Sequence, residues 1–306
     1  MSTDITSRRV PWVAVALSFL SAGVGHVYCG RVAKGLPLYF AWLLVPICTI
    51  AAAMMGRPSA FGLGLLLVPG AIVVAVALYA AMDAWRLAHE TGRDYSLRDY
   101  NRPGVYWLLI AVQLVFSIGL IVGVRSFVYE AFVIPTRSMK PTILQGDRIL
   151  SRKLLPTHHF PARGDLVVYR NPTPKGGSRF IGRVVAVAGD KVATNDEKLL
   201  VNGKELERDR VPDDGLELLG EQLSGQFAYE ENSGRRYLVT YDGSDNAPGN
   251  MEATVPERHV FVIGDNRDRS RDSREFGSIH VGDIDGYVDY IYWPAESWSR
   301  FGVAND

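Results

Sequence analysis

The hydrophobic pattern divides the chain into two unlike parts. Up to about residue 124 the apolar residues form four long segments, and beyond it they form short runs separated by Gly, Pro and charged residues. A helix that crosses a bilayer needs about 20 mostly apolar residues, whereas a typical strand has only about five. The pattern therefore predicts a membrane domain over residues 1–124 and a mainly β domain over residues 125–306.

The apolar segments of the first part are residues 11–28, 36–55, 61–85 and 105–124. The last three are expected to span a membrane. The first is interrupted by Gly23, Gly25 and Gly30, so that it spans, lies in the interface or re-enters. Small residues of this kind favour close helix packing. His26, in the same stretch, is interpreted as a packing residue rather than a ligand or proton carrier.

Loop charges orient the segments. The loop between residues 85 and 105 carries the largest cluster of short-loop arginines, which places it in the cytoplasm. The helix over 105–124 then runs outward, and the β domain lies on the extracytoplasmic side. This cluster comprises Arg86, Arg93, Arg98 and Arg102.

Charge and cysteine content exclude two classes of protein. Lys plus Arg and Asp plus Glu number 33 each, and no basic stripe predicts a nucleic-acid partner. The two cysteines, Cys29 and Cys48, both lie in the apolar part, which excludes a disulfide framework in the β domain.

The second part reads as an antiparallel β domain with little helix. The dipeptide Asn202-Gly203 between two apolar runs is a strong hairpin signal. Residues from about 194 to 257 are expected to form an elaborated subdomain. The predicted strands are residues 166–169, 180–187, 199–201, 260–263 and 287–292.

The stretch from Ile134 to Thr142 carries the candidate chemistry. Pro135 and Pro141 stiffen the backbone on either side of Ser138, so its hydroxyl lies on a rigid segment. Ser138 is therefore the candidate nucleophile. Thr136 is placed to hold a developing oxyanion together with the backbone N–H of Ser138. The alternative interpretation of this stretch is an ordinary turn between two strands.

Four ordered blocks resemble bacterial type I signal peptidases, which belong to the serine/lysine clan. The blocks are residues 124–142, residues 146–149, residues 163–190 with their Gly189-Asp190 end, and residues 264–277. The resemblance implies a multi-pass serine endopeptidase of the bacterial cytoplasmic (inner) membrane. Such an enzyme removes N-terminal signal peptides from exported preproteins after small residues, without a cofactor or metal. Its partners would be those signal peptides and the lipid bilayer; an oligomeric state is not predicted.

The same resemblance assigns roles to further residues. Asp272 and Arg274 would form a structural ion pair beside the site, Ser270 would hydrogen-bond the general base, and Arg183 would support the site. A calcium loop at 264–277 is disfavoured because arginines neutralise its carboxylates. Shallow pockets for small substrate residues would be lined by Phe132, Ile134, Met139 and Ile181.

One position departs from the family pattern. The family uses a lysine, kept neutral by apolar neighbours, as general base, and here Gly182 stands at that position. Arg179 and Arg183 cannot replace it, because a guanidinium is not deprotonated in proteins. Lys175 is the preferred substitute, since Gly176-Gly177 would let it fold back. The other candidates are Lys140, Lys153, His158, His159 and His280.

Two alternatives to an active peptidase stay open. The absence of a lysine at Gly182 favours a catalytically impaired relative that binds exported chains or regulates their processing. A self-cleaving repressor of the related serine/lysine clan is disfavoured, because the chain has membrane segments and lacks a DNA-binding segment.

Overall fold

The computed structural model contains two compact units, residues Met1–Arg125 and Ser126–Asp306. It describes residues 9–55, 60–91, 95–153, 160–172, 178–195, 198–211, 226–241 and 250–304.

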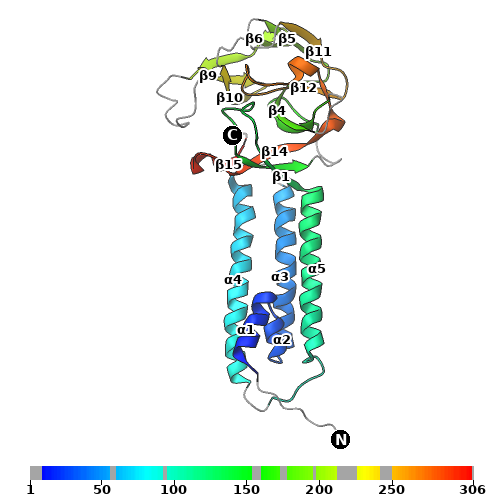
Figure 1. Cartoon of the computed structure of the whole chain (residues 1–306), viewed down its shortest axis with the longest axis vertical. Coiled ribbons are helices and arrows are strands. Elements are labelled where there is room, and N and C mark those ends of the chain that lie inside the picture. The colour runs from blue at the N-terminus through cyan, green and yellow to red at the C-terminus, as the bar shows by residue number, and fades with distance from the viewer. Residues whose placement is uncertain are drawn as a thin grey trace. The chain divides into compact units, whose positions relative to one another are not determined.

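The first unit is helical (Figure 1). The predicted segment 11–28 forms two short helices, α1 and α2, separated at Gly23, whose φ is +93°. A Cβ on Gly23 would lie 2.1 Å from the carbonyl oxygen of Gly35, so the two backbones meet without room for a side chain. The helices are α1 (Pro11–Leu20), α2 (Val24–Tyr28), α3 (Val32–Met55), α4 (Ala60–Glu90) and α5 (Pro103–Phe127).

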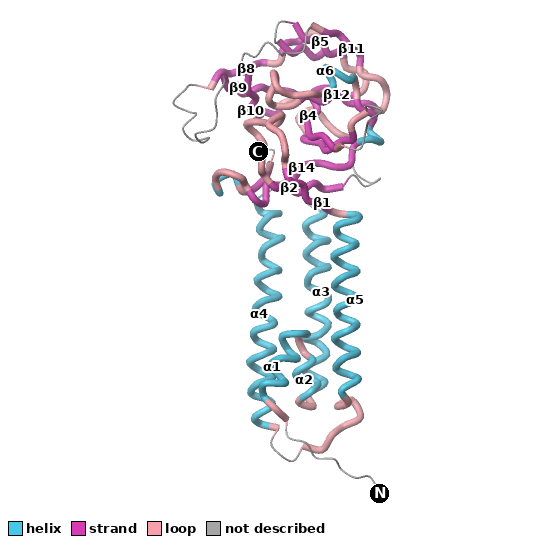
Figure 2. The backbone as a smooth tube through the Cα atoms, viewed as in Figure 1, coloured by secondary structure: helices cyan, strands magenta, loops and turns pink. Residues whose placement is uncertain are grey.

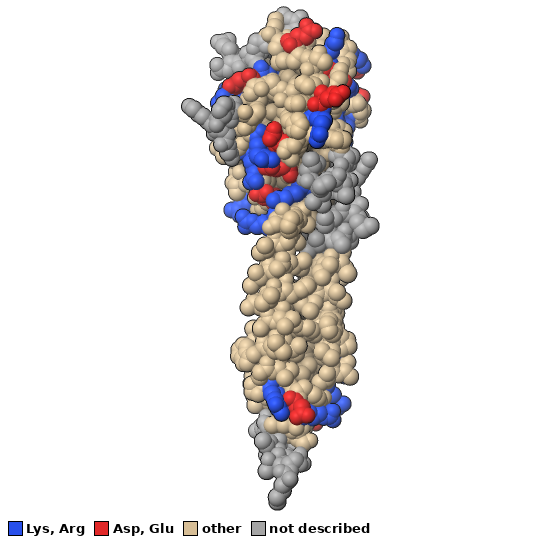
Figure 3. Space-filling view, turned by 90° about the vertical axis from the view of Figure 1, so that its right-hand side faces the viewer, with Lys and Arg blue, Asp and Glu red and all other residues tan. Residues whose placement is uncertain are grey.

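Two helices among the described residues are long and apolar enough to cross a membrane. They are Gly70–Glu90 of α4, with 21 residues, and Pro103–Phe127, which is α5, with 25 residues. Pro11–Leu20 and Val32–Cys48 are shorter apolar helices. On the face shown in Figure 3, this unit is uncharged along most of its length, and its charged side chains gather near one end.

Buried polar groups hold the short helices of this unit in place. The His26 ring is fully buried, and its Nε2 lies 2.9 Å from Oδ2 of Asp83. The Asn101 side-chain amide donates to the carbonyl of Val27 at 2.9 Å. His26 is therefore a hydrogen-bonded packing residue in this structure.

The second unit is built on one antiparallel sheet in the order β1-β2-β14-β3-β4-β12-β13, with β15 pairing with β14 (Figure 2). Its strands are β1 (Tyr129–Val133), β2 (Arg148–Lys153), β3 (Leu166–Arg170), β4 (Arg179–Val187), β12 (His259–Ile263), β13 (Ile279–His280), β14 (Ile284–Trp293) and β15 (Gly302–Val303).

Strand β3 is buried on both faces and divides the core. Leu166 and Val168 pack with the residues around Met139, whereas Val167 and Tyr169 pack on the opposite side with Val262 and its neighbours. The alternation of side chains along a strand explains this division.

Two smaller antiparallel sheets complete the unit, within the region predicted as an elaborated subdomain. Asn202 and Gly203, at φ +55° and +77°, form the predicted hairpin turn between β6 and β7. The mainly antiparallel β fold is thus confirmed, since the only helices described in this unit are α6 (Ser273–Phe276), η2 (Val281–Asp283) and η3 (Trp298–Arg300). The smaller sheets consist of β5 (Lys191–Asn195), β6 (Lys198–Val201), β7 (Lys204–Glu205) and β11 (Met251–Thr254), and of β8 (Glu207–Arg210), β9 (Gln226–Asn232) and β10 (Arg235–Tyr241).

A buried carboxylate joins the first three strands of the large sheet. Asp289 of β14 forms an ion pair with Arg152 of β2 at 3.0 Å and accepts a hydrogen bond from the Tyr129 hydroxyl of β1 at 3.3 Å. Burial raises the pKa of Asp289 to about 6, against the opposing effects of Arg152 and Tyr129. In the unfolded chain the pKa of an aspartate is about 4.

This raised pKa predicts a pH-dependent contribution to stability. Between about pH 4 and pH 6 the folded Asp289 holds a proton that the unfolded chain has released, so stability falls as the pH rises. Asp289→Asn cannot titrate, and its stability relative to the wild type is expected to rise over this range. Thermal unfolding followed by the β-sheet circular dichroism at pH 4 and 6.5 measures this. Asp209→Asn, at an exposed position, is the control and should show no such trend.

Candidate active site

The candidate nucleophile lies in the turn between β1 and β2, and one buried carboxylate closes that turn. The Asp147 side chain accepts the backbone N–H of Leu144 at 2.7 Å and the backbone N–H of Ala295 at 2.8 Å. Arg300 forms an ion pair with the same carboxylate at 2.9 Å. At the base of the turn, the backbone N–H of Ile134 donates to the carbonyl of Asp147 at 2.9 Å. The turn is therefore anchored before any ligand arrives.

Ser138 and Thr136 present their hydroxyls to the same space. Their Oγ atoms lie 3.2 Å apart, Ser138 is half-buried and Thr136 is exposed. The next residue, Met139, is buried in the core. The turn thus fixes one side chain inward and leaves the Ser138 hydroxyl accessible.

The loop after β12 holds the main chain of this turn directly. The backbone N–H of Asn266 donates to the carbonyl of Ser138 at 3.0 Å, and the Asn266 side-chain amide donates to the carbonyl of Arg137 at 3.1 Å. A Cβ on Gly264 would lie 2.2 Å from Oγ of Ser270 and 2.6 Å from the carbonyl oxygen of Ser138. The structure therefore brings Ser138 and Ser270 together across a position where only glycine fits.

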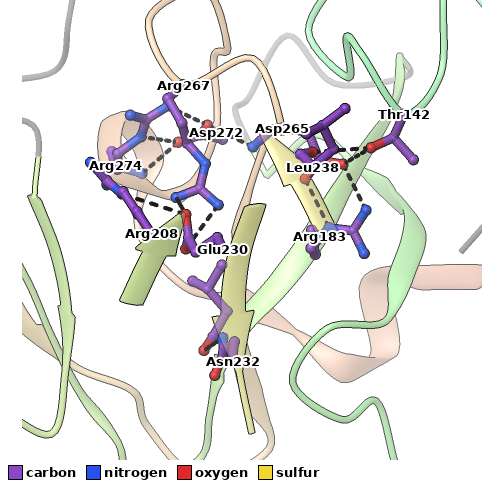
Figure 4. A network of polar contacts seen from close by, with 12 residues as sticks. Thr142, Arg183, Arg208, Glu230, Asn232, Leu238, Asp265, Arg267, Asp272 and Arg274 are labelled. Atoms are coloured by element: carbon purple, nitrogen blue, oxygen red, sulfur yellow. Dashed lines mark hydrogen bonds and ion pairs between the residues drawn. The ribbon is translucent and has the colours of Figure 1, made fainter. Parts of the chain in front are cut away.

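Two buried ion pairs support this loop (Figure 4). The Arg183 guanidinium donates to both carboxylate oxygens of Asp265, at 2.8 and 2.7 Å. Asp265 also accepts the hydroxyl of Thr142 at 2.6 Å, which links the loop to the turn. Arg274 binds both oxygens of Asp272 at 2.8 Å, and Asp272 accepts the backbone N–H of Gly264 at 3.0 Å.

These pairings also bear on metal binding. The Asp265 and Asp272 carboxylates of the loop face arginines, which fits the sequence argument against calcium. Among the described residues there is no group of three or more His, Cys, Asp and Glu side chains that could hold a metal ion.

The backbone at the position of the expected base is closely packed. A Cβ on Gly182 would lie 2.4 Å from Cγ1 of Val262 and 3.5 Å from Cε1 of Tyr169. The prediction that another side chain supplies the base stays a prediction, because the preferred candidate, Lys175, lies outside the described residues. Burial and the nearby Asp272 carboxylate raise the pKa of Tyr169, so its phenol stays protonated and is no base.

The described base candidates have other partners. Nζ of Lys153 forms an ion pair with Glu130 at 3.2 Å, and Nδ1 of His280 accepts the backbone N–H of Gly282 at 3.0 Å. Nζ of Lys140 lies 5.9 Å from the centroid of the Phe227 ring. Lys175, His158 and His159 lie outside the described residues.

The apolar residues assigned to substrate pockets lie in one cluster. Ile134 and Met139 are buried in it, and Phe132 and Ile181 are partly buried against it. These side chains come from β1, the nucleophile turn and β4, so the cluster adjoins the Ser138 turn.

Sequence reasoning missed several residues that hold the site. Asn266 stands in the 264–277 block and Asp147 in the 146–149 block, but the sequence alone assigns a role to neither. The pairing of Arg183 with Asp265 joins two of the recognised blocks, but no local pattern indicates that these side chains meet.

Comparisons with known proteins match most of α5 together with most of the second unit. Residues 107–293 match the family model described as signal peptidase, peptidase S26. A signal peptidase I from Bacillus caldolyticus is 29% identical over 183 residues, which cover 60% of this chain and 90% of that protein. A probable signal peptidase I-2 from Synechocystis sp. is 28% identical over 219 residues, covering 70% and 84%. A crystal structure of a signal peptidase I from Enterococcus faecalis is 27% identical, with a TM-score of 0.26, and covers 43% of this chain and 98% of that one.

The crowding at Gly264 predicts that this position tolerates no side chain. In Gly264→Ala the new methyl group would overlap Ser270 and the Ser138 carbonyl, at an expected cost of about 1–3 kcal/mol in the free energy of unfolding. Chemical denaturation of the full chain in detergent measures this cost. Gly119→Ala is the control, because a Cβ at that position would meet no atom within 4 Å. Equal stability of the two variants would contradict the prediction.

Proposed function

The chain belongs to the signal peptidase family, peptidase S26, and is a peptidase of that type; we propose that it cleaves signal peptides from exported preproteins with Ser138 as the nucleophile. The observation that carries the proposal is the contact between the Ser138 turn and the 264–277 loop through Asn266. It holds an accessible serine hydroxyl on a main chain that is fixed from both sides.

The proposed reaction is acyl transfer to Ser138. Its Oγ attacks the carbonyl carbon of the scissile peptide bond while a base takes the hydroxyl proton. The Thr136 hydroxyl, 3.2 Å from Oγ of Ser138, and the Ser138 N–H stabilise the oxyanion. The amide nitrogen leaves with a proton, and water then hydrolyses the ester and restores the serine.

The substrate is proposed to bind as an extended segment beside strand β1, which lies at the edge of the large sheet. An edge strand offers free backbone groups to an extended peptide. The apolar cluster around Ile134 and Met139 then accepts small residues before the cleaved bond.

We place the chain in the bacterial cytoplasmic membrane as a multi-pass protein. The arginines between residues 85 and 105 would be cytoplasmic, and the β unit extracytoplasmic. There the bilayer delivers the membrane-bound signal peptide to the site.

A specific observation favours a second candidate function. Gly182 stands where the family has its lysine, a Cβ there would lie 2.4 Å from Cγ1 of Val262, and the described candidates Lys153 and His280 have other partners. Without a base, a serine site keeps only about 10³- to 10⁴-fold rate enhancement over water. The second candidate is thus an impaired relative that binds exported chains or regulates their processing. In the first, Lys175 is the proposed base.

Replacement of the nucleophile tests the proposed reaction. Ser138→Ala is expected to lower the rate of signal-peptide cleavage by about 10³-fold or more, because no ester can form. The assay uses the full chain in lipid vesicles and a preprotein with small residues before the cleavage site. Arg137→Ala, which changes the exposed neighbour, serves as the control and should retain most activity. Equal processing by wild type and Ser138→Ala would refute the assignment.

A relocated lysine tests the identity of the base. Lys175→Met is expected to abolish cleavage, and adding Gly182→Lys together with Val262→Ala is expected to restore it. Val262→Ala is needed because Cγ1 of Val262 would lie only 2.4 Å from a Cβ at position 182. Gly182→Lys alone should be destabilised by about 1–3 kcal/mol.

The same variants separate the two candidate functions. If the wild type is inactive and Gly182→Lys with Val262→Ala gains activity, the chain is the impaired relative. If the wild type is active and Lys175→Met has no effect, Lys175 is not the base.

A further inference from the structure

The sheet β8-β9-β10 is joined to the site by main-chain hydrogen bonds. The backbone N–H of Thr240 in β10 donates to the carbonyl of Asp265 at 2.9 Å, and the backbone N–H of Arg267 donates to the carbonyl of Thr240 at 2.9 Å. Thr240 and Asn266 form an isolated parallel bridge. The region predicted as a surface elaboration thus contacts the residues on either side of Asn266.

A buried ion pair reinforces this junction. Glu230 of β9 is fully buried, and its carboxylate binds the Arg267 guanidinium through both oxygens, at 3.0 and 3.2 Å (Figure 4). The Arg267 side chain is 4% exposed. Arg208 of β8 approaches the same carboxylate at 3.9 Å.

The physical role of Glu230 follows from this burial. A buried charge that loses its partner is strongly unfavourable, so the Arg267 guanidinium is held wherever the Glu230 carboxylate lies. Arg267 directly follows Asn266, whose backbone and side chain bind the carbonyls of Ser138 and Arg137. A shift of Arg267 would therefore move the donors that fix the nucleophile turn.

We propose that Glu230 is a positioning residue for the active site, which holds Arg267 and, through Asn266, fixes Ser138 in its reactive place. The effect on catalysis rests on the proposed function, whereas the effect on the position of the turn does not. The three-stranded sheet is, in this view, a part of the catalytic unit.

The test compares Glu230→Gln with Glu231→Gln in the full chain in lipid vesicles. Both variants remove one carboxylate from β9, but Glu231 is exposed on the opposite face. Two kinds of measurement are made: amide hydrogen exchange of peptides covering residues 136–142 and 264–268, and the kinetics of preprotein cleavage, which give kcat and KM.

Glu230→Gln is expected to speed exchange in both peptides about tenfold or more, because the hydrogen bonds of Asn266 open more often. It should lower kcat about 100-fold with little change in KM, since a displacement of about 1 Å at a reacting group costs that much. Glu231→Gln should match the wild type. Glu230→Asp, which keeps the charge, should recover part of both losses.

The outcomes are separable. Unchanged exchange in both peptides with an intact fold overturns the proposal, as does an equal effect of Glu231→Gln. If the wild type does not cleave, the proposed function fails, and the exchange data still decide the role of Glu230. If the amides of β3 and β14 also exchange faster in Glu230→Gln, the variant has destabilised the whole sheet. Arg267→Lys is then tested in its place, by hydrogen exchange of the same two peptides and by kcat and KM.

Discussion

The site depends on the fully buried ion pair between Arg183 and Asp265. Arg183 also donates to the carbonyl of Gly164, and Asp265 accepts the hydroxyl of Thr142 and, through its carbonyl, the N–H of Thr240. One pair thus joins strand β4, the segment before β3, the nucleophile turn and the three-stranded sheet. Because both charges lie in the interior, removing either one would leave the other buried without a partner, which is strongly destabilising.

The two faces of strand β4 pack against different parts of the core, and this determines the surroundings of position 182. Gly182 faces the layer of Val262 and Tyr169, whereas the neighbouring Ile181 packs toward Met139. A lysine at position 182 would be desolvated by these apolar neighbours, the condition that lowers a lysine pKa. In this chain the Val262 and Tyr169 side chains pack directly against the backbone of Gly182. The described residues thus keep the supports of the Ser138 turn, while glycine at position 182 leaves β4 packed closely against Val262.

Much of the architecture could be predicted because the signals are local. The apolar run Leu166–Tyr169 predicts a buried strand. Asn202-Gly203 predicts a hairpin turn, because both residues tolerate a positive φ. The break at Gly23 was also visible. Family resemblance supplied the candidate site, and its Asp272–Arg274 pair is present.

The long-range contacts were beyond sequence reasoning. Glu230 and Arg267 look like ordinary charged residues, and only the fold makes them a buried pair. The filling of the space beside Gly182 depends equally on the register of β4 and β12, with its irregularity between Phe261 and Val262. The hydrophobic pattern of a strand indicates which face is buried, but it does not reveal a bulge that shifts the register part-way along the strand.

The hydrogen bonds from Asn266 to the turn are accepted only by main-chain carbonyls, those of Arg137 and Ser138. It does not depend on which side chains those two residues carry. The Ser138 hydroxyl and the main chain that holds it are consequently separate parts of the structure, so replacing the serine side chain removes the hydroxyl without removing a hydrogen bond that positions the turn.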